Sequence, residues 1–213
     1  MERMRDHLRA GAAIYNDGYY HAAHDAWEGL WLDLEDGTDD ERLLHGLIQA
    51  TAAVYHARER NWAGAVGLAE SARGYLDGLP STHRDVDLPP LRSSLERLAA
   101  DPELVERRPP VPIEHEGDTP ALATLGFRPT AIAAVVLGEA LGFDTTPLER
   151  ARRYAEQDLE AGDDDSRFIA LLFDFVRERE HRGLVYQRLT DHVGRRRSRE
   201  ADVDGLFEPT DES

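Results

Sequence analysis

The segment from residue 41 to 60, ERLLHGLIQATAAVYHARER, constrains the fold of this chain more than any other. Between Leu43 and Ala57 it is apolar or small on nearly every side of a helix, which is typical of a central helix that other elements surround. Helical periodicities and capping residues recur along the rest of the chain, and no segment has the sustained two-residue alternation of a half-buried strand. We therefore expect an all-α protein, a helical bundle built around this central helix.

Caps and turns divide the chain further. They predict five helices in the first half, at about 3–15, 19–32, 39–60, 62–78 and 90–100. A proline-rich stretch, RRPPVPIEHEGDTP, follows at residues 107–120 and is typical of a linker or an extended arm. Later helices are expected at about 129–141, from Pro147 with Thr146 as a cap, through FIALLFDFV, and at about 183–197. The predicted organisation is a bundle at 1–106, the linker or arm at 107–120, and a C-terminal helical layer or small domain at 121–213.

The charge of the chain limits its partners. It carries 42 acids against 25 arginines and no lysine, for a formal charge of −17. Such a surface repels nucleic acids and anionic membranes, so we expect neither as a partner. A high-salt cytosol explains the acid excess, because salt screens the self-repulsion, whereas an arginine-favouring genome explains only the missing lysine. We interpret the chain as acidic and halophilic.

Other features exclude whole classes of function. The absence of cysteine excludes disulfides, thiolate catalysis and zinc sites built on cysteine. The first residues contain no apolar signal segment, and the longest apolar run is interrupted by Glu139, so we expect a soluble, cytoplasmic protein. The chain has no glycine-rich phosphate loop, no nucleophile elbow and no dinucleotide motif. A homo-oligomer remains open.

The expected second helix contains the first candidate residues. At 100° per residue, His24, Trp27 and Trp31 fall in one narrow sector with Glu28 at its edge, while Asp25 lies further round, near His21. The tryptophans indicate a buried face, and His24 would lie in it beside a carboxylate. Burying such a pair costs roughly several kcal/mol unless each group has a hydrogen-bond or ion-pair partner.

The central helix offers those partners. Its polar residues His45, Gln49 and His56 form one stripe. His45 and His56 are about 16 Å apart along the axis and cannot bind the same ion, whereas His24 and Glu28 are about 6 Å apart. The candidate site is therefore His24, Glu28 and Gln49 with one of the two histidines.

The chemistry of this cluster has three interpretations. Two histidines and a carboxylate suit a divalent transition metal, and a neutral histidine oriented by Glu28 suits general-base catalysis. The third interpretation is a structural polar network between helices. The predicted function is accordingly the binding of an unidentified small ligand or the stabilisation of the fold. The alternatives are a metal-assisted or acid–base hydrolase and a protein–protein interaction module.

Three motifs in order resemble a known family. NDGYYHAAHDAWEGLW at 16–31, GLIQATAAVYH at 46–56 and RERNWAGA ending at 65 resemble domain of unknown function 309, over roughly residues 8–80. The resemblance implies a compact helical bundle and no established activity. It places the motif residues between the second and third helices; they are His24, Glu28, Trp31, Gln49 and His56.

Three positions refine that resemblance. His45 is not a motif position, so His56 is favoured, and the metal candidates become His24, Glu28 and His56. Asp25 stands where the family usually has glutamate, which puts a role for this acid in question. Arg60 stands where the family usually has glycine, so we expect the turn before Asn61 not to need a positive φ.

A run of arginines lies near the C-terminus, at residues 195–199. In isolation it resembles a nucleic-acid patch, but acids follow it directly. We expect local neutralisation by those acids or salt bridges to acidic helices.

Overall fold

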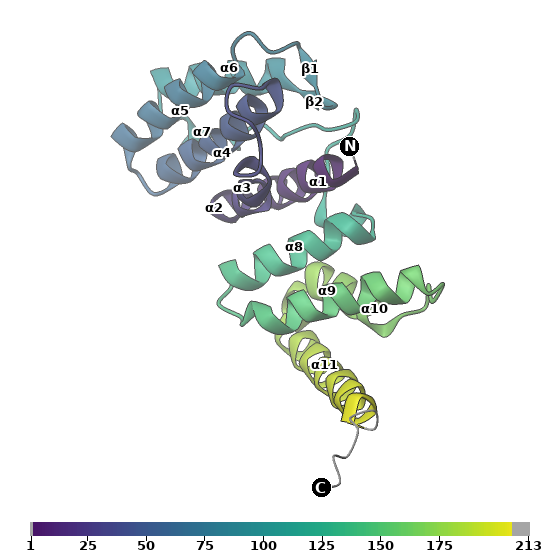
Figure 1. The fold of residues 1–213 in the computed structure, drawn as a ribbon. Helices are drawn as coiled ribbons and strands as arrows, with labels where there is room; N and C mark the ends of the chain where they lie inside the picture. The colour runs from purple at the N-terminus through teal and green to yellow at the C-terminus, as the bar shows by residue number, and fades with distance from the viewer. Residues whose placement is uncertain (1, 206–213) are drawn as a thin grey trace, which may run out of the picture.

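The computed structural model describes residues 2–205 and shows two groups of helices (Figure 1). The N-terminal group comprises α1 (Glu2–Asn16), α2 (Tyr20–Ala23), α3 (Asp25–Trp31), α4 (Asp39–Arg58), α5 (Trp62–Leu76), β1 (Thr82–His83), β2 (Val86–Asp87), α6 (Leu88–Ala100) and α7 (Leu104–Arg107). The C-terminal group comprises η1 (Leu122–Thr124), α8 (Phe127–Ala140), α9 (Thr145–Glu160), α10 (Arg167–Arg177), η2 (Arg179–His181) and α11 (Arg182–Gly205). The all-α prediction is confirmed. Within residues 2–205, none of the helices has the length and hydrophobicity needed to cross a bilayer.

The central helix of the N-terminal group is α4. Leu43, Leu44 and Leu47 are fully buried, and α4 packs on α5, α2 and α3. The approach of α5 is close: a Cβ added to Gly46 would lie 2.5 Å from Leu76 Cδ2. Glycine at this position therefore lets the two helix axes come together. Thr38 caps the start of α4, since its hydroxyl accepts the Glu41 N–H at 3.2 Å.

The second expected helix is not continuous, and this part of the prediction is wrong. The chain forms α2 and α3, which meet at His24. The His24 carbonyl accepts the N–H groups of both Trp27 and Glu28 at 2.9 Å. The His24 backbone keeps helical dihedrals, φ −67° and ψ −33°, so the interruption lies in the hydrogen-bond pattern and not in the direction of the chain.

The segment after α7 is extended and contacts two parts of the N-terminal group. His115 forms isolated β-bridges with Val86 of the β1–β2 hairpin and with Asp118. The hairpin turn contains Arg84 at φ 49° and Asp85 at φ 61°, the pair of left-handed residues that a tight antiparallel hairpin requires. This short hairpin was not predicted from the sequence.

The same segment is fastened to α1, and we call residues 108–121 the arm. The Asn16 amide donates to the carbonyls of Ile113 and Pro120 at 3.0 Å each and accepts the Ile113 N–H at 2.9 Å. Glu116 accepts hydrogen bonds from Arg5 and Arg9 of the same helix. The arm therefore ties residues about a hundred positions apart.

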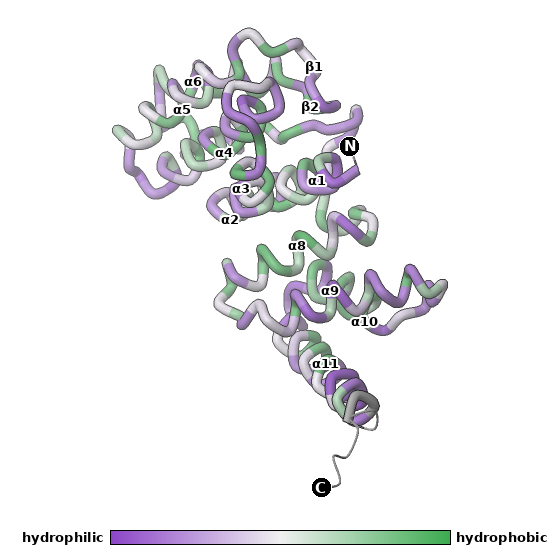
Figure 2. Tube along the Cα trace, in the orientation of Figure 1, coloured by the Kyte–Doolittle hydropathy of each residue, from purple (hydrophilic) through white to green (hydrophobic). Residues whose placement is uncertain are grey.

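The C-terminal group rests on the first through α8, which packs on α1. Figure 2 shows α8 as a largely hydrophobic helix between the two groups, and its Ala133, Ala134 and Leu137 are fully buried. Whether the two groups are separate domains stays a prediction. The expected Thr146 cap is wrong: α9 begins at Thr145, and Asp144 accepts the Thr146 N–H at 2.9 Å. The acids at 208–212 lie outside the described residues.

Candidate functional site

Three candidate side chains lie together at His24 and the start of α3. His24 Nε2 lies 2.8 Å from Asp25 Oδ1, and one ligand atom of each of His24, Asp25 and Glu28 lies within 4.8 Å of the others. In the described part of the chain, this is the one group of three or more such residues that is close enough to hold an ion. The His24 and Asp25 side chains are 20% and 33% exposed. We call these three residues the His24 cluster.

The electrostatics of the cluster centre on the imidazole. The hydrogen bond to Asp25 raises the pKa of His24, against an opposing effect of burial, with the nearby Asp25 and Glu28 charges adding to the increase. Its other nitrogen, Nδ1, is buried and has no hydrogen-bond partner among the described residues. One imidazole nitrogen is thus held by a carboxylate, the other is buried without a well-formed hydrogen bond among the described residues, and the His21 backbone adds to the raised pKa.

Asp25 lies on the side of His21, as helical spacing predicts, because both residues line one hollow, described below, that His24 does not line. Its carboxylate also reaches the neighbouring imidazole, with Oδ1 2.8 Å from His24 Nε2, and this contact was not predicted. The shortened carboxylate, whose role the sequence put in question, is the nearest acidic partner of His24.

The two tryptophans form hydrogen bonds with different parts of the bundle. Trp27 is fully buried, and its indole N–H donates to the His7 carbonyl at 2.9 Å. Trp31 instead donates to Glu41 Oε1 at 2.9 Å, and the same oxygen lies 3.1 Å from His45 Nδ1. The hydrogen bonds from Trp31, His45 and Gly37 outweigh the effect of burial and lower the pKa of Glu41. Trp31 therefore belongs to a second cluster, at the start of α4.

His56 is held at a helix start. Asn61 caps α5, since its Oδ1 accepts the Gly64 N–H at 3.1 Å, and its amide nitrogen lies 2.8 Å from His56 Nδ1. Because the amide nitrogen can only donate, His56 Nδ1 accepts and its Nε2 carries the proton. A Cβ added to Gly64 would lie 2.7 Å from the Asn61 amide nitrogen. The Asn61–Gly64 pair of the third motif thus has a capping role.

Gln49 is half-buried on α4. In the described residues, no hydrogen bond or ion pair joins Gln49 or His56 to His24 or Glu28. The four predicted site residues therefore divide into His24 and Glu28, at and just after the start of α3, and Gln49 and His56 on α4.

Beside the His24 cluster lies a hollow of about 700 Å³, which Asp25 lines together with Tyr20, His21, Tyr55 and Arg58. The His21 ring stacks on Tyr55, with centroids 4.7 Å apart and planes at 20°. Sequence reasoning missed these aromatic residues. Their positions next to motif residues, His21 three before His24 and Tyr55 directly before His56, were the available signal.

The turn before Asn61 contradicts the expectation drawn from the family. Arg60 has φ 58°, so the left-handed conformation is present although the residue is not glycine. The turn follows the end of α4, where the Asn61 N–H bonds to the His56 carbonyl at 2.8 Å. Arg60 therefore adopts the left-handed conformation at a steric cost that glycine would not have.

This conformation gives a test. Arg60→Gly is expected to be more stable than Arg60→Ala by about 1 kcal/mol, because a left-handed L-residue costs roughly 1–2 kcal/mol and glycine's greater unfolded-state freedom offsets part of the gain. Both variants lose the exposed ion pair between Arg60 and Glu106, so their difference isolates the backbone. Chemical denaturation measures it, and equal midpoints would contradict the assignment.

The comparisons with known proteins concern the N-terminal group. Residues 8–68 match the family model described as Domain of unknown function (DUF309). The predicted resemblance is confirmed, although the match ends before residue 80 and covers under a third of the chain. No curated protein matches the chain. The match includes the whole His24 cluster, together with Gln49 and His56.

Proposed function

We propose that the His24 cluster binds one divalent transition-metal ion. The observation that carries this proposal is the convergence of an imidazole and two carboxylates within 4.8 Å. Imidazole and carboxylate ligands suit zinc, manganese, iron and nickel, and three protein ligands leave a coordination position open. The bundle fixes the backbone of all three residues, because α3 is anchored by the buried Trp27.

The charges around the cluster support a cation. Asp25 has His24 as its only ion-pair partner among the described residues, and within the same residues Glu28 has none, although the chain contains 25 arginines. Two carboxylates close together repel each other unless a positive charge lies between them. The two carboxylates favour a positive charge on His24, since the hydrogen bond to Asp25 and the Asp25 and Glu28 charges raise the pKa of its imidazole.

The hollow of about 700 Å³ beside the cluster supports binding of a small ligand next to the ion. Asp25 lines this hollow, whereas His24 and Glu28 do not. A metal-assisted or acid–base hydrolase would need the reactive face of the ion to reach the substrate directly. We therefore place metal and small-ligand binding ahead of the hydrolase alternative.

The test is a metal titration of the full chain, purified without a histidine tag and stripped of metal. We expect stoichiometric binding of Zn²⁺ or Mn²⁺ by calorimetry, and a loss of affinity of at least about tenfold in His24→Ala and in Glu28→Gln, each of which removes a ligand. The control is His181→Ala, which removes an exposed histidine 3.9 Å from Glu178 and should leave the affinity unchanged. Absence of binding, with both cluster variants less stable, would support a structural network instead.

The pH dependence of this binding has a definite sign. Metal requires neutral His24, and hydrogen bonding to Asp25 raises the pKa of that imidazole, with Glu28 adding charge and the His21 ring 4.9 Å away. Zinc affinity should therefore begin to fall at a higher pH than expected for an ordinary histidine, and titrations from about pH 5 to pH 8 cover the range in which histidine changes its charge. Without metal, the stability contributed by protonated His24 is present below the ordinary value and is lost as pH rises through the raised one. Calorimetry across this range, with Asp25→Asn as the comparison, checks the shift; a flat profile would contradict it.

A further inference from the structure

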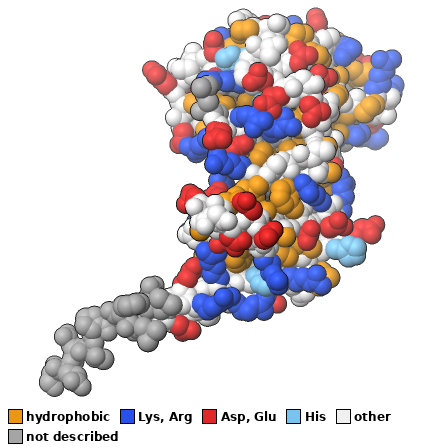
Figure 3. Space-filling model, turned by 90° about the vertical axis from the view of Figure 1, so that its right-hand side faces the viewer, with side chains coloured by type: hydrophobic (Ala, Val, Ile, Leu, Met, Phe, Trp, Pro, Cys, Tyr) orange, Lys and Arg blue, Asp and Glu red, His pale blue; other side chains and the backbone are white. Residues whose placement is uncertain are grey.

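A second hollow lies in the C-terminal group, far from the His24 cluster in the chain. It has a volume of about 1250 Å³ and is bounded by α9, the start of α10 and the last turns of α11. Seven arginines line it: Arg150 and Arg153 on α9, Arg167 on α10, and four on α11 between residues 195 and 199. Figure 3 shows arginine side chains gathered on this C-terminal group. We call this the arginine hollow.

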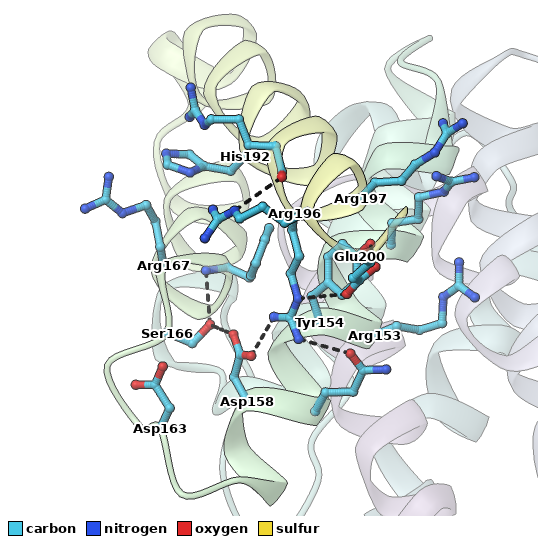
Figure 4. A pocket seen from close by; sticks show the side chains of 15 residues that line it. Arg153, Tyr154, Asp158, Asp163, Ser166, Arg167, His192, Arg196, Arg197 and Glu200 are labelled. Atoms are coloured by element: carbon cyan, nitrogen blue, oxygen red, sulfur yellow. Dashed lines mark hydrogen bonds and ion pairs between the residues drawn. The ribbon is translucent and has the colours of Figure 1, made fainter. Parts of the chain in front are cut away.

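One of the seven arginines, Arg196, has a structural role in the lining of the hollow. Arg196 pairs with Asp158 at 2.5 Å and with Glu200 at 3.2 Å, and it donates to Gln157 at 3.2 Å (Figure 4). Its guanidinium also lies 4.2 Å from the centre of the Tyr154 ring. The expected neutralisation of the arginine run therefore applies to Arg196, which fastens α11 to α9.

The charges of the other six arginines are not neutralised by ion pairs among the described residues. Among the described residues, none of Arg150, Arg153, Arg167, Arg195, Arg197 and Arg199 forms an ion pair. The lining contains three carboxylates, of which two are taken by Arg196. The third is Asp163, whose Oδ1 accepts the Asp165 N–H. The result is a concentrated positive site on a chain with a formal charge of −17.

Two further features of the hollow are consistent with a positive electrostatic potential. Helix α10, eleven residues long, begins at the hollow with Ser166 as its cap, so its positive N-terminal end adds to the field. His192 lies in the lining, and its pKa is lowered by burial first and then by the charges of Arg195 and Arg167. Its protonation is opposed because the positive charges around it exceed those of nearby acids such as Asp191.

We propose that the arginine hollow binds a small anion that carries several phosphate groups, such as inorganic tripolyphosphate. Guanidinium groups bind phosphate oxygens in bidentate pairs, and arginines from three helices around one concavity suit a compact ligand with several such groups. A nucleic-acid duplex would need a longer basic surface, and the acidic remainder of this chain repels it. The size of the hollow and the charge of the chain thus favour the small anion.

The test uses the full chain and inorganic tripolyphosphate in calorimetric titrations, at a KCl concentration where circular dichroism shows the protein folded. The test variant combines Arg153→Gln with Arg195→Gln, two exposed residues without an ion pair among the described residues. The control is Arg188→Gln, which removes an exposed arginine of α11 outside the hollow. We expect the double variant to bind at least about tenfold more weakly, because it loses two charged hydrogen-bond donors to the phosphate oxygens, and the control to bind within about twofold of the parent.

Each other outcome overturns the proposal. Equal affinity in the double variant and the control would mean that the anion binds by net charge alone. Equal affinity for tripolyphosphate and sulfate would remove the preference for several phosphate groups. Tighter binding of duplex DNA, lost in the same double variant, would assign the hollow to nucleic acid. Unfolding of the double variant is tested by its melting temperature, and Arg167→Gln on α10 then replaces it.

Discussion

Gly11→Ala is expected to destabilise the protein by about 2 kcal/mol or more, in the usual range for overpacked cores. A Cβ at Gly11 would lie 2.2 Å from Trp27 Cε2 and 2.3 Å from Trp27 Nε1. The indole cannot move aside easily, because it is fully buried and bonded to the His7 carbonyl. The clash outweighs the gain in helix propensity of about 1 kcal/mol that alanine brings.

The matched control is the same substitution where space is free. Gly67 lies inside α5, and a Cβ there would meet no atom within 4 Å. Gly67→Ala should therefore stabilise the protein by up to about 1 kcal/mol. In urea denaturation, the free energy of unfolding should fall in Gly11→Ala and rise in Gly67→Ala if α1 and α3 pack as described. A stable Gly11→Ala protein would show that Trp27 does not occupy this position.

Arg182→Met is expected to cost about 3 kcal/mol or more, because it removes hydrogen bonds from a charged donor and leaves buried acceptors without partners. Arg182 is 6% exposed. Its guanidinium donates to the carbonyls of Phe175 and Val176 at 3.0 and 3.1 Å and to the Tyr19 hydroxyl at 2.9 Å. The last bond joins the C-terminal group to the start of α2. Thermal and urea unfolding measure the loss.

Two companion variants separate the parts of this effect. Tyr19→Phe removes only the bond between the groups and should cost about 1 kcal/mol. Arg188→Met, an exposed position on the same helix, should change stability by less than about 0.5 kcal/mol. If Arg182→Met matched Arg188→Met, the buried arginine would contribute nothing to holding the groups together.

The features that sequence could predict are those set by local spacing. The apolar surround of α4 and the recurring caps predicted the helical class, and the separation of four residues predicted that His24 and Glu28 would lie close together. Trp27 was predicted to lie in a buried face for the same reason. The family motifs around Asn16, His24 and Asn61 were recognised because each lies within one short segment.

The remaining features depend on the reach of single side chains, on local backbone conformation or on distant contacts. The contact between Asp25 and His24 was not predicted because helical spacing separates adjacent side chains by about 100°, and the conformation of Arg60 was misjudged because its residue type was taken to decide its φ. The arginine hollow could not be predicted, since Arg153 and Arg195 come together only when α9 and α11 pack. Periodicity within one helix carries no information about such a pairing.

The fastening of the arm to α1 has a consequence for the order of folding during synthesis. Asn16 bonds to Ile113 and Pro120, and Arg5 and Arg9 bond to Glu116, so α1 acquires these contacts only after roughly half of the chain has been made. At about 5–20 residues per second, the ribosome needs roughly 5–20 s to supply those hundred residues. The segment that matches the family model ends at residue 68, before the arm and α8 exist. One side of α1 in the nascent chain therefore stays uncovered until residues beyond the matched segment have been made.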